Sequence, residues 1–230
     1  MIDVEVVHVF VGADGAGGSP LGVVRDVVSV RGTADRQEVA RRLGFSETVF
    51  VDDAERGEVD IYTPSARLPF AGYPLIGTAW LLREHGLPVE VLRTAAGEVR
   101  TRADGEFTWI RGRAEWVGGK RTQQFASPDE VDALPAPPVG EGWLYAWAWA
   151  DEAAGAVRAR GFPRRGDAIV EDEATGAAAL LLAGELGRDL RIRQGTGSDI
   201  VARAAGAGWV EVGGRVTGVE VRRLDSAAQG

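Results

Sequence analysis

Two short segments carry residues whose types and spacing could do chemistry. One runs from Phe70 to Ala79 and the other from Glu171 to Ala179, and each places a glycine, Gly72 or Gly176, in a tight turn before an apolar helix. Glycine lets the backbone come close to a ligand, and the free N–H groups of a first helical turn attract a carboxylate or phosphate. Two such helix starts predict two matched halves that face each other across one small anionic substrate.

Two carboxylates stand close to such features. Glu47 lies among apolar residues where a helix is expected to end and a strand to begin. If it points inward, desolvation raises its pKa toward neutrality, as a general acid/base requires; the alternative is an outward glutamate on a strand edge. Asp172 belongs to an acidic trio before the second helix. It either only stabilises the helix dipole or faces the cleft and holds a polar group of the substrate.

Other polar and aromatic groups are less specific. The loop from Gln194 to Ser198 could cradle an anion, whereas Ser19 follows two glycines in what is by composition a turn. The alternating aromatic residues between Trp143 and Trp149 line one face of a strand. That face is expected to be core or a subunit interface, with the wall of a pocket as the alternative. Arg158 and Arg160, on the next strand, are expected on a solvated face.

Composition narrows the chemistry. The chain of 230 residues has no cysteine and two histidines, so we exclude thiol, zinc-thiolate and iron–sulfur chemistry and expect no multi-histidine metal centre. The net charge of −8 argues against a nucleic-acid partner, and the apolar runs fall short of a membrane span. The acidic start is not a signal peptide, so we expect a cytoplasmic protein. Carboxylates, hydroxyls, arginines and backbone dipoles remain to do the chemistry.

The pattern of apolar residues predicts an α+β fold with two similar lobes. Each lobe is expected to be a mainly antiparallel curled sheet around a central helix, because the helix containing Ala177–Ala183 is apolar all round and must be buried. The expected lobes are 1–115 and 116–230, with a linker at about 126–142 and a last strand able to cross to the first lobe. The predicted strands are 2–11, 20–28, 49–52, 59–63, 89–94, 98–103, 107–112, 143–150, 156–162, 190–194, 200–204, 209–212 and 216–224; the predicted helices are 35–43, 74–85, a short one at 128–134, and one from the Asp172 turn to about 186.

A resemblance to a known family rests on motifs spread nearly end to end. They are Ser19 to Val24, Leu43 to Val51, Tyr62 to Pro64, Leu68 to Gly72, Pro74, Gly77 to Ala79, Glu171 and Asp172, Ala174 to Gly176, Gln194 and Gly195, and Val212 to Gly214. With them the chain resembles the phenazine biosynthesis PhzF-like isomerase family, relatives of diaminopimelate epimerase. The resemblance implies two similar lobes with the active site between them, a homodimer, and catalysis without metal or organic cofactor.

The resemblance also implies roles for residues. Glu47 matches the glutamate that removes and returns a proton, and Asp172 matches a second carboxylate in the cleft. The N–H groups at Gly72 and Gly176 match the anion-binding turns. The implied substrate-binding set is Ser19, Gly72, Tyr73, Thr175, Gly176, Ala177, Gln194 and Gly195.

Three positions depart from the family pattern: Ser19 stands in place of Asn, Tyr73 in place of His, and Ala177 in place of Ser. Tyrosine titrates near 10 and cannot shuttle protons at neutral pH unless it is strongly perturbed. Loss of one donor aimed at developing charge costs roughly 3 kcal/mol. The leading expectation is an isomerase that moves a proton on a small, carboxylate-bearing, conjugated secondary metabolite. The alternatives are a lyase, hydrolase or cyclase step in the same pocket, or ligand binding without catalysis.

Overall fold

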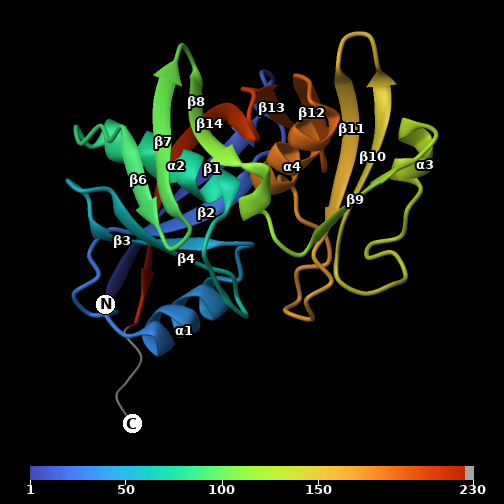
Figure 1. Ribbon diagram of the computed structural model, residues 1–230. Coiled ribbons are helices and arrows are strands. Elements are labelled where there is room, and N and C mark those ends of the chain that lie inside the picture. Colours follow the sequence, from blue (N-terminus) through green and yellow to red (C-terminus); the bar gives the residue numbers. More distant parts are fainter. Residues whose placement is uncertain (226–230) are drawn as a thin grey trace.

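The computed structural model describes residues 1–225, and residues 226–230 lie outside the described part. Fourteen strands form one continuous sheet that curls around two helices (Figure 1). The strands are β1 (Ile2–Val11), β2 (Ser19–Val24), β3 (Thr48–Asp53), β4 (Glu58–Tyr62), β5 (Arg67–Leu68), β6 (Val91–Thr94), β7 (Gly97–Asp104), β8 (Phe107–Arg113), β9 (Lys120–Gln124), β10 (Trp143–Asp151), β11 (Ala156–Phe162), β12 (Leu190–Gln194), β13 (Ser198–Ala204) and β14 (Trp209–Leu224). The helices are α1 (Thr33–Leu43), α2 (Gly72–Glu84), the 3-10 turn η1 (Ala114–Trp116), α3 (Pro128–Asp132) and α4 (Gly176–Leu186).

The first half of the sheet closes into a ring. Its order is β1-β2-β3-β4-β6-β7-β8-β14, and β14 also pairs with β1. Helix α2 lies inside this ring with nearly every residue of its first three turns buried. Because the helix is apolar on all sides, an enclosing sheet is the arrangement that removes its whole surface from water.

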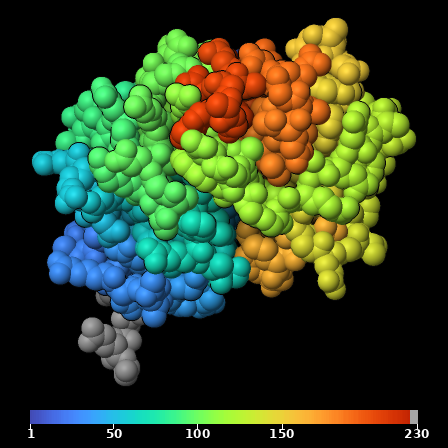
Figure 2. All heavy atoms as spheres, viewed as in Figure 1, coloured from blue at the N-terminus to red at the C-terminus, as the bar shows by residue number. Residues whose placement is uncertain are grey.

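The second half of the sheet curls over α4. From β14 the order continues through β13, β12, β11 and β10 to β9, and α4 is buried along the same alanine and leucine run that predicted a central helix. Most strand pairs are antiparallel; β2–β3, β4–β6, β9–β10 and β11–β12 are parallel. The prediction of an α+β fold with curled, mainly antiparallel sheets around central helices is confirmed. Figure 2 shows the two halves side by side, blue to green on the left and yellow to orange on the right.

Strand β14 belongs to both halves. Two strands were expected at 209–212 and 216–224, but one strand of 16 residues covers both ranges. Its first part pairs with β8 and β13, and its second part pairs with β1. The strand passes closely between two aromatic side chains: a Cβ on Gly213 would lie 2.3 Å from the Trp109 ring, and one on Gly214 would lie 2.3 Å from the Phe10 ring. Two consecutive glycines therefore let this strand pass from one half to the other.

The segment before the expected linker forms a strand that was not predicted. Residues 120–124, for which no element was expected, form β9, which pairs in parallel with β10. Residues 126–142 lie between these two paired strands and contain α3. The division of the chain into lobes at residue 115 stays a prediction. Within residues 1–225, no helix combines the length and the apolarity that a membrane span needs.

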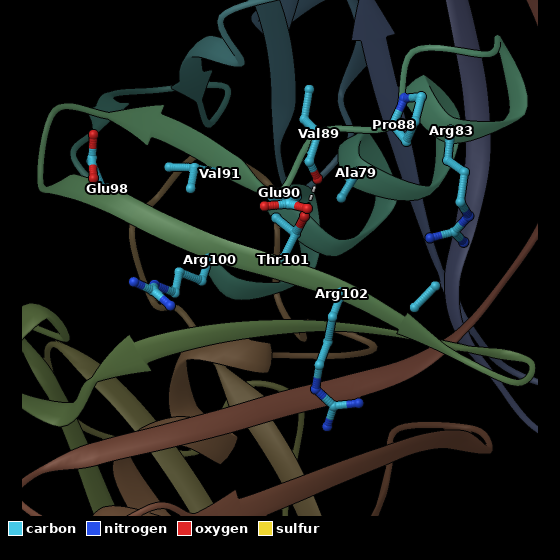
Figure 3. A pocket seen from close by; sticks show the side chains of 11 residues that line it. Ala79, Arg83, Pro88, Val89, Glu90, Val91, Glu98, Arg100, Thr101 and Arg102 are labelled. Atoms are coloured by element: carbon cyan, nitrogen blue, oxygen red, sulfur yellow. Dashed lines mark hydrogen bonds between the residues drawn. The ribbon is translucent and has the colours of Figure 1, made fainter.

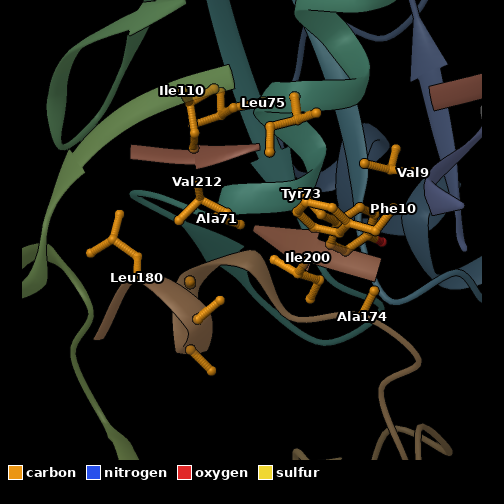
Figure 4. Packing of buried hydrophobic residues seen from close by; sticks show 14 of the residues in the cluster. Val9, Phe10, Ala71, Tyr73, Leu75, Ile110, Ala174, Leu180, Ile200 and Val212 are labelled. Carbon is orange, nitrogen blue, oxygen red and sulfur yellow. The ribbon is translucent and has the colours of Figure 1, made fainter. Parts of the chain in front are cut away.

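The main hydrophobic core runs continuously from one half to the other. Phe10, Tyr73, Ile200, Ala174 and Leu180 of α4 belong to this one core cluster and are labelled in Figure 4. Tyr73 comes from α2, whereas Ile200 and Ala174 belong to the second half of the chain. The start of α2 is thus held against the second half by apolar packing, and this contact places the candidate site.

Candidate active site

The first turns of α2 and α4 face each other in direct backbone contact. A Cβ on Gly72 would lie 2.6 Å from the carbonyl carbon of Gly176, and a Cβ on Gly176 would lie 2.9 Å from the Tyr73 nitrogen. Only glycine fits at this distance. Neither helix has a side-chain cap from its N-cap residue, Ala71 or Thr175, and neither has an acid in its first turn. Two helix N-termini therefore converge with backbone N–H groups that no capping side chain satisfies.

A small pocket lies at this meeting point. It is lined by Glu47, Leu68, Ala71, Gly72, Tyr73, Lys120, Trp143, Asp172, Thr175, Gly176 and Ala177. Its volume is about 10 Å³, no more than the space one water molecule needs. Eight residues besides Glu47 and Asp172 were predicted to bind substrate, and five of them line the pocket: Gly72, Tyr73, Thr175, Gly176 and Ala177. The other three, Ser19, Gln194 and Gly195, do not line it.

Glu47 points inward, as the functional interpretation of its position expected. The residue is 8% exposed, and its Oε2 is buried with no hydrogen-bond partner in residues 1–225. Burial raises its pKa from 4.5 to about 7, and the charge of Asp172 acts in the same direction; Arg165, Lys120 and Tyr73 oppose the rise. A carboxyl group with this pKa is present in both protonation states near neutral pH.

Asp172 is the second buried carboxyl group. Its backbone N–H donates to Gly161 O at 2.8 Å, and its Oδ2 accepts a hydrogen bond from the Thr175 hydroxyl at 2.7 Å. Its Oδ1 is buried and has no partner among residues 1–225. Burial raises the pKa of Asp172, against hydrogen bonds from Thr175 and Ser46 that lower it. Each carboxyl group of the pocket thus keeps one oxygen without a protein partner.

Tyr73 holds the backbone of Glu47 through a hydrogen bond. The Glu47 backbone N–H donates to the Tyr73 phenol oxygen at 3.0 Å, and the phenol donates to Pro20 O at 3.5 Å. Burial, Glu47 and Asp172 raise the pKa of Tyr73 well above 10, while neighbouring Ser19 lowers it. Tyr73 is therefore a neutral phenol at every ordinary pH. It holds the backbone of Glu47 in place and does not carry protons.

Gln194 lies behind the pocket, where all its polar atoms are used within the protein. Its Oε1 accepts from the Tyr145 hydroxyl and the Thr175 N–H, both at 3.0 Å. Its Nε2 donates to Asp172 O and to Thr175 Oγ1, both at 2.8 Å. This saturated side chain fixes the turn that presents Asp172 and Thr175. The structure does not bring Gln194 or Gly195 into the pocket.

The loop that follows Gln194 does cradle an anion, and that anion is the carboxylate of Glu173. Glu173 accepts from the Thr196 N–H, the Thr196 hydroxyl and the Ser198 hydroxyl, each at 2.9 Å. A Cβ on Gly195 would lie 2.2 Å from Glu173 Oε2. The close approach of this carboxylate requires glycine at position 195. The loop thus anchors the acidic trio rather than a ligand.

The aromatic strand face is core along most of its length. Tyr145 and Trp147 are buried in the main core, and Trp147 meets Trp149 edge to face at 5.1 Å. Only Trp143 reaches the pocket. Arg160, expected on a solvated face, instead pairs with Glu171 at 2.6 Å and donates to carbonyl groups at the end of α3.

Two cations of the site were missed from the sequence. Lys120 lines the pocket, and Arg165 lies near enough for its charge to lower the pKa of both Glu47 and Asp172. One signal was present in the composition: Lys120 is the only lysine among 26 lysine and arginine residues. Arg165 carries no comparable signal, because it is one arginine among many.

A larger hollow elsewhere lacks these features. A groove of about 520 Å³ lies between α2 and strands β6 and β7, lined in part by Arg83, Arg100 and Arg102 (Figure 3). Arg83 donates to the Thr108 hydroxyl, and Arg102 pairs with Glu211. None of the predicted site residues lines this groove. The small pocket between the helix N-termini is therefore the stronger candidate for chemistry.

Sequence comparisons relate the first half of the chain to one family. Residues 7–115 match the model of the phenazine biosynthesis-like protein family, PhzC-PhzF. An uncharacterized isomerase from Mesorhizobium japonicum is 37% identical over 99 residues, which cover 38% of this chain and 32% of that protein. The trans-2,3-dihydro-3-hydroxyanthranilate isomerase of Pseudomonas fluorescens is 39% identical over 71 residues, which cover 30% of this chain and 25% of that protein. The matched stretches thus span about a third or less of these relatives.

The fold comparison covers nearly the whole chain. The structure of a predicted epimerase from Pseudomonas aeruginosa superimposes with a TM-score of 0.76 at 22% identity, over 97% of this chain and 99% of that one. At this identity the likeness shows the fold alone. Residues 7–115 thus resemble the PhzC-PhzF phenazine biosynthesis-like family, and the chain as a whole has the diaminopimelate epimerase-like fold.

Proposed function

We propose that this protein is an isomerase that moves a proton on a small, conjugated, carboxylate-bearing molecule without a cofactor. One observation carries the proposal. Two buried carboxyl groups, Glu47 and Asp172, each keep an oxygen without a protein partner in a pocket that two uncapped helix N-termini also line. Such a pocket offers an acid/base group and an anion site within one small space. The named relatives support the reaction class, since both are called isomerases.

The chemistry begins with Glu47 as a carboxylate. It takes a proton from a carbon next to the carboxyl-bearing or unsaturated centre of the substrate, and the electron pair of that C–H bond moves into the conjugated system. The resulting enolate-like charge falls on oxygens held by the N–H groups at Gly72 and Gly176, where fixed dipoles stabilise it. Glu47, now protonated, returns the proton to another carbon of the same system. A pKa of about 7 suits both directions, because neither protonation state is rare near neutral pH.

Asp172 has a different part in this proposal. Its Oδ2 is held by Thr175, so the free Oδ1 is the oxygen that can accept a hydrogen bond from the substrate. An amino or hydroxyl group next to the reacting carbon is the natural donor. Asp172 would orient the substrate so that the C–H bond faces Glu47.

Entry of a substrate requires the two halves to move apart. A pocket of about 10 Å³ holds no more than one water molecule, so the structure corresponds to a closed arrangement. Closure places the two helix N-termini together and excludes bulk water, which strengthens electrostatic effects in the site. A homodimer, a cytoplasmic location and a role in secondary metabolism remain predictions from the family resemblance.

A deuterium experiment tests the proposal. The protein is incubated in D₂O with trans-2,3-dihydro-3-hydroxyanthranilate, the compound in the name of the Pseudomonas fluorescens relative, and products are followed by mass spectrometry. We expect an isomer that carries solvent deuterium on carbon, formed by wild type and by the exposed control Glu55→Gln. Glu47→Gln should abolish the incorporation. Undiminished incorporation by Glu47→Gln would exclude the proposed role of Glu47.

A second candidate is a diverged reaction, or ligand binding alone, in the same pocket. The observation that favours it is the neutral phenol of Tyr73, which cannot replace an imidazole in proton transfer. Product mass separates the reactions, because hydrolysis adds water, a lyase step removes a fragment, and isomerisation or cyclisation changes nothing. If wild type is inactive on the test compound and Tyr73→His with Ala177→Ser creates activity, the native chain has left the isomerase chemistry of its relatives.

A further inference from the structure

The only lysine of the chain lies in the candidate pocket. Twenty-five of the 26 lysine and arginine residues are arginine, and the exception, Lys120, lines the space between Glu47, Asp172 and the two helix N-termini. Lysine differs from arginine in carrying a compact point charge on a flexible stem, and its pKa shifts more readily on burial. The site therefore contains a cation of a kind that the rest of the chain does not use.

Lys120 and Trp143 form one wall of the pocket. They are direct partners in the parallel pairing of β9 with β10, and the Lys120 Nζ lies 4.9 Å from the centre of the Trp143 ring. An ammonium group at this distance is attracted to the ring face. The wall thus combines an aromatic ring with a positive charge that lies over it.

The Lys120 ammonium has three hydrogen atoms to donate, and no acceptor among residues 1–225 takes one. Burial lowers its pKa, and the charges of Glu47 and Asp172 raise it, while Arg165 lowers it further; no hydrogen bond contributes. Arg165 differs in two ways: its Nε pairs with Asp167 at 2.8 Å, with its Nη2 buried and without a partner among residues 1–225, and it does not line the pocket. Lys120 is therefore the cation that lines the pocket.

We propose that Lys120 binds a second anionic or hydroxyl oxygen of the substrate, so that the pocket selects flat acids with two acidic oxygens rather than simple monocarboxylates. This inference rests on the proposed function, in which the helix N-termini hold the first carboxylate. The second oxygen then meets the ammonium while the flat part of the molecule lies against Trp143. A second carboxylate and an enolic or phenolic oxygen share this chemistry.

Three flat aromatic acids distinguish a second carboxylate from a hydroxyl oxygen as the group that Lys120 binds. Benzoate has one carboxylate, salicylate adds a neighbouring hydroxyl, and phthalate adds a neighbouring carboxylate. Isothermal titration calorimetry with wild type should show salicylate or phthalate binding about tenfold tighter than benzoate, the size of one charge-assisted hydrogen bond. A preference for phthalate identifies a second carboxylate, and one for salicylate identifies a hydroxyl oxygen. No preference for either, or no binding of any probe, would overturn the proposal.

Variants locate the preference at Lys120. Lys120→Met keeps the length of the side chain and removes the charge, so it should erase the preference and leave benzoate affinity nearly unchanged. Arg121→Met is the matched control, since Arg121 is the exposed next residue of β9, and it should keep the preference. If Lys120→Met weakens all probes by one factor, Lys120 contacts the first carboxylate and the proposal is wrong.

A measurement on wild type removes any dependence on the folding of variants. Protein labelled with ¹³C-lysine has one Cε signal, because the chain has one lysine. The preferred two-oxygen probe should shift this signal and its titration to higher pH, and benzoate should do so much less. Equal shifts would refute the second contact. Binding to Glu47→Gln separates the two proposals: a preserved preference there upholds the role of Lys120 even if deuterium incorporation fails in wild type.

Discussion

The backbone N–H of Glu47 donates to the phenol oxygen of Tyr73 at 3.0 Å. The side chain of Tyr73 is thus bound to the main chain of the proposed acid/base residue. Burial and the nearby carboxyl groups raise the pKa of Tyr73 well above 10, so the phenol is neutral near neutral pH. In this structure Tyr73 is a fixed support for the Glu47 backbone.

Tyr73→Phe should destabilise the protein by about 1–3 kcal/mol, because it leaves the buried N–H of Glu47 without an acceptor. Urea unfolding measures the loss. Deuterium incorporation should fall as well, since Glu47 loses its anchor. Tyr145→Phe is the control: it removes a buried hydroxyl that donates to Gln194 at 3.0 Å, outside the pocket lining. A similar stability loss with normal incorporation in Tyr73→Phe would contradict the supporting role.

Stability should fall as pH rises through neutrality, and Glu47 should be a main cause. Its pKa is raised in the folded state from 4.5 to about 7, so the folded protein holds the proton more tightly than the unfolded chain. The contribution is therefore fully present below pH 4.5 and is lost as pH rises through about 7. It amounts to roughly 3 kcal/mol.

Glu47→Gln checks this pH dependence. The amide resembles the protonated acid and does not titrate, so the stability of wild type relative to the variant should fall by that amount between pH 4.5 and pH 8. Urea unfolding at several pH values gives the difference. Asp172, whose pKa is also raised by burial, leaves a dependence of the same sign in the variant. Parallel stability curves for the two proteins would mean that Glu47 is not held in a desolvated site.

Gly72→Ala should separate the two helix N-termini. Its Cβ would lie 2.6 Å from the carbonyl carbon of Gly176 and 2.7 Å from the nitrogen of Ala177, so backbone must shift. We expect a loss of about 1–3 kcal/mol in stability and weaker benzoate binding in calorimetry. Gly118→Ala is the matched control, because a Cβ there meets nothing within 4 Å. Unchanged benzoate affinity in Gly72→Ala would show that the facing turns do not hold the carboxylate.

Gln194→Leu should be among the most destabilising single changes, because several buried partners lose their hydrogen bonds together. The Tyr145 hydroxyl, the Thr175 N–H and the carbonyl of Asp172 are left unsatisfied. Each such group costs about 1–3 kcal/mol, so we expect a loss of at least about 3 kcal/mol in urea unfolding. Gln123→Leu, on exposed strand β9, should change little. A mild effect at position 194 would place Gln194 outside the support of Asp172.

Strong periodic patterns predicted the fold well. The alternating run of β1 and the apolar run of α4 each correspond to the observed element, because burial of one strand face or of a whole helix leaves a clear trace in sequence. Strand β9 was missed because Lys120 to Gln124 is polar throughout and half exposed. Its strand conformation comes from pairing with β10, which no local pattern records. The missed lysine of the site lies on this missed strand.

The residues of the candidate site show the same difference between local patterns, which predict well, and contacts between distant segments, which do not. Glu47 and Asp172 could be proposed from local sequence and resemblance, and the structure places both in one buried pocket. Gln194 and Arg160 could not be assigned, since their roles depend on which groups surround them in space. Arg160 donates to the Leu134 carbonyl at 2.7 Å, a contact between residues 26 apart in sequence. Side chains that serve as internal supports are therefore the hardest to identify from sequence.

The path of β14 has a consequence for biosynthesis. Ile2 pairs with Leu224 and Val9 with Val216, so β1 keeps an unpaired edge until β14 has also left the ribosome. Contacts this distant in sequence slow folding, and an exposed strand edge invites aggregation of the nascent protein. We expect the ring formed by the first half of the sheet to stay open until β14 is synthesised and pairs with β1.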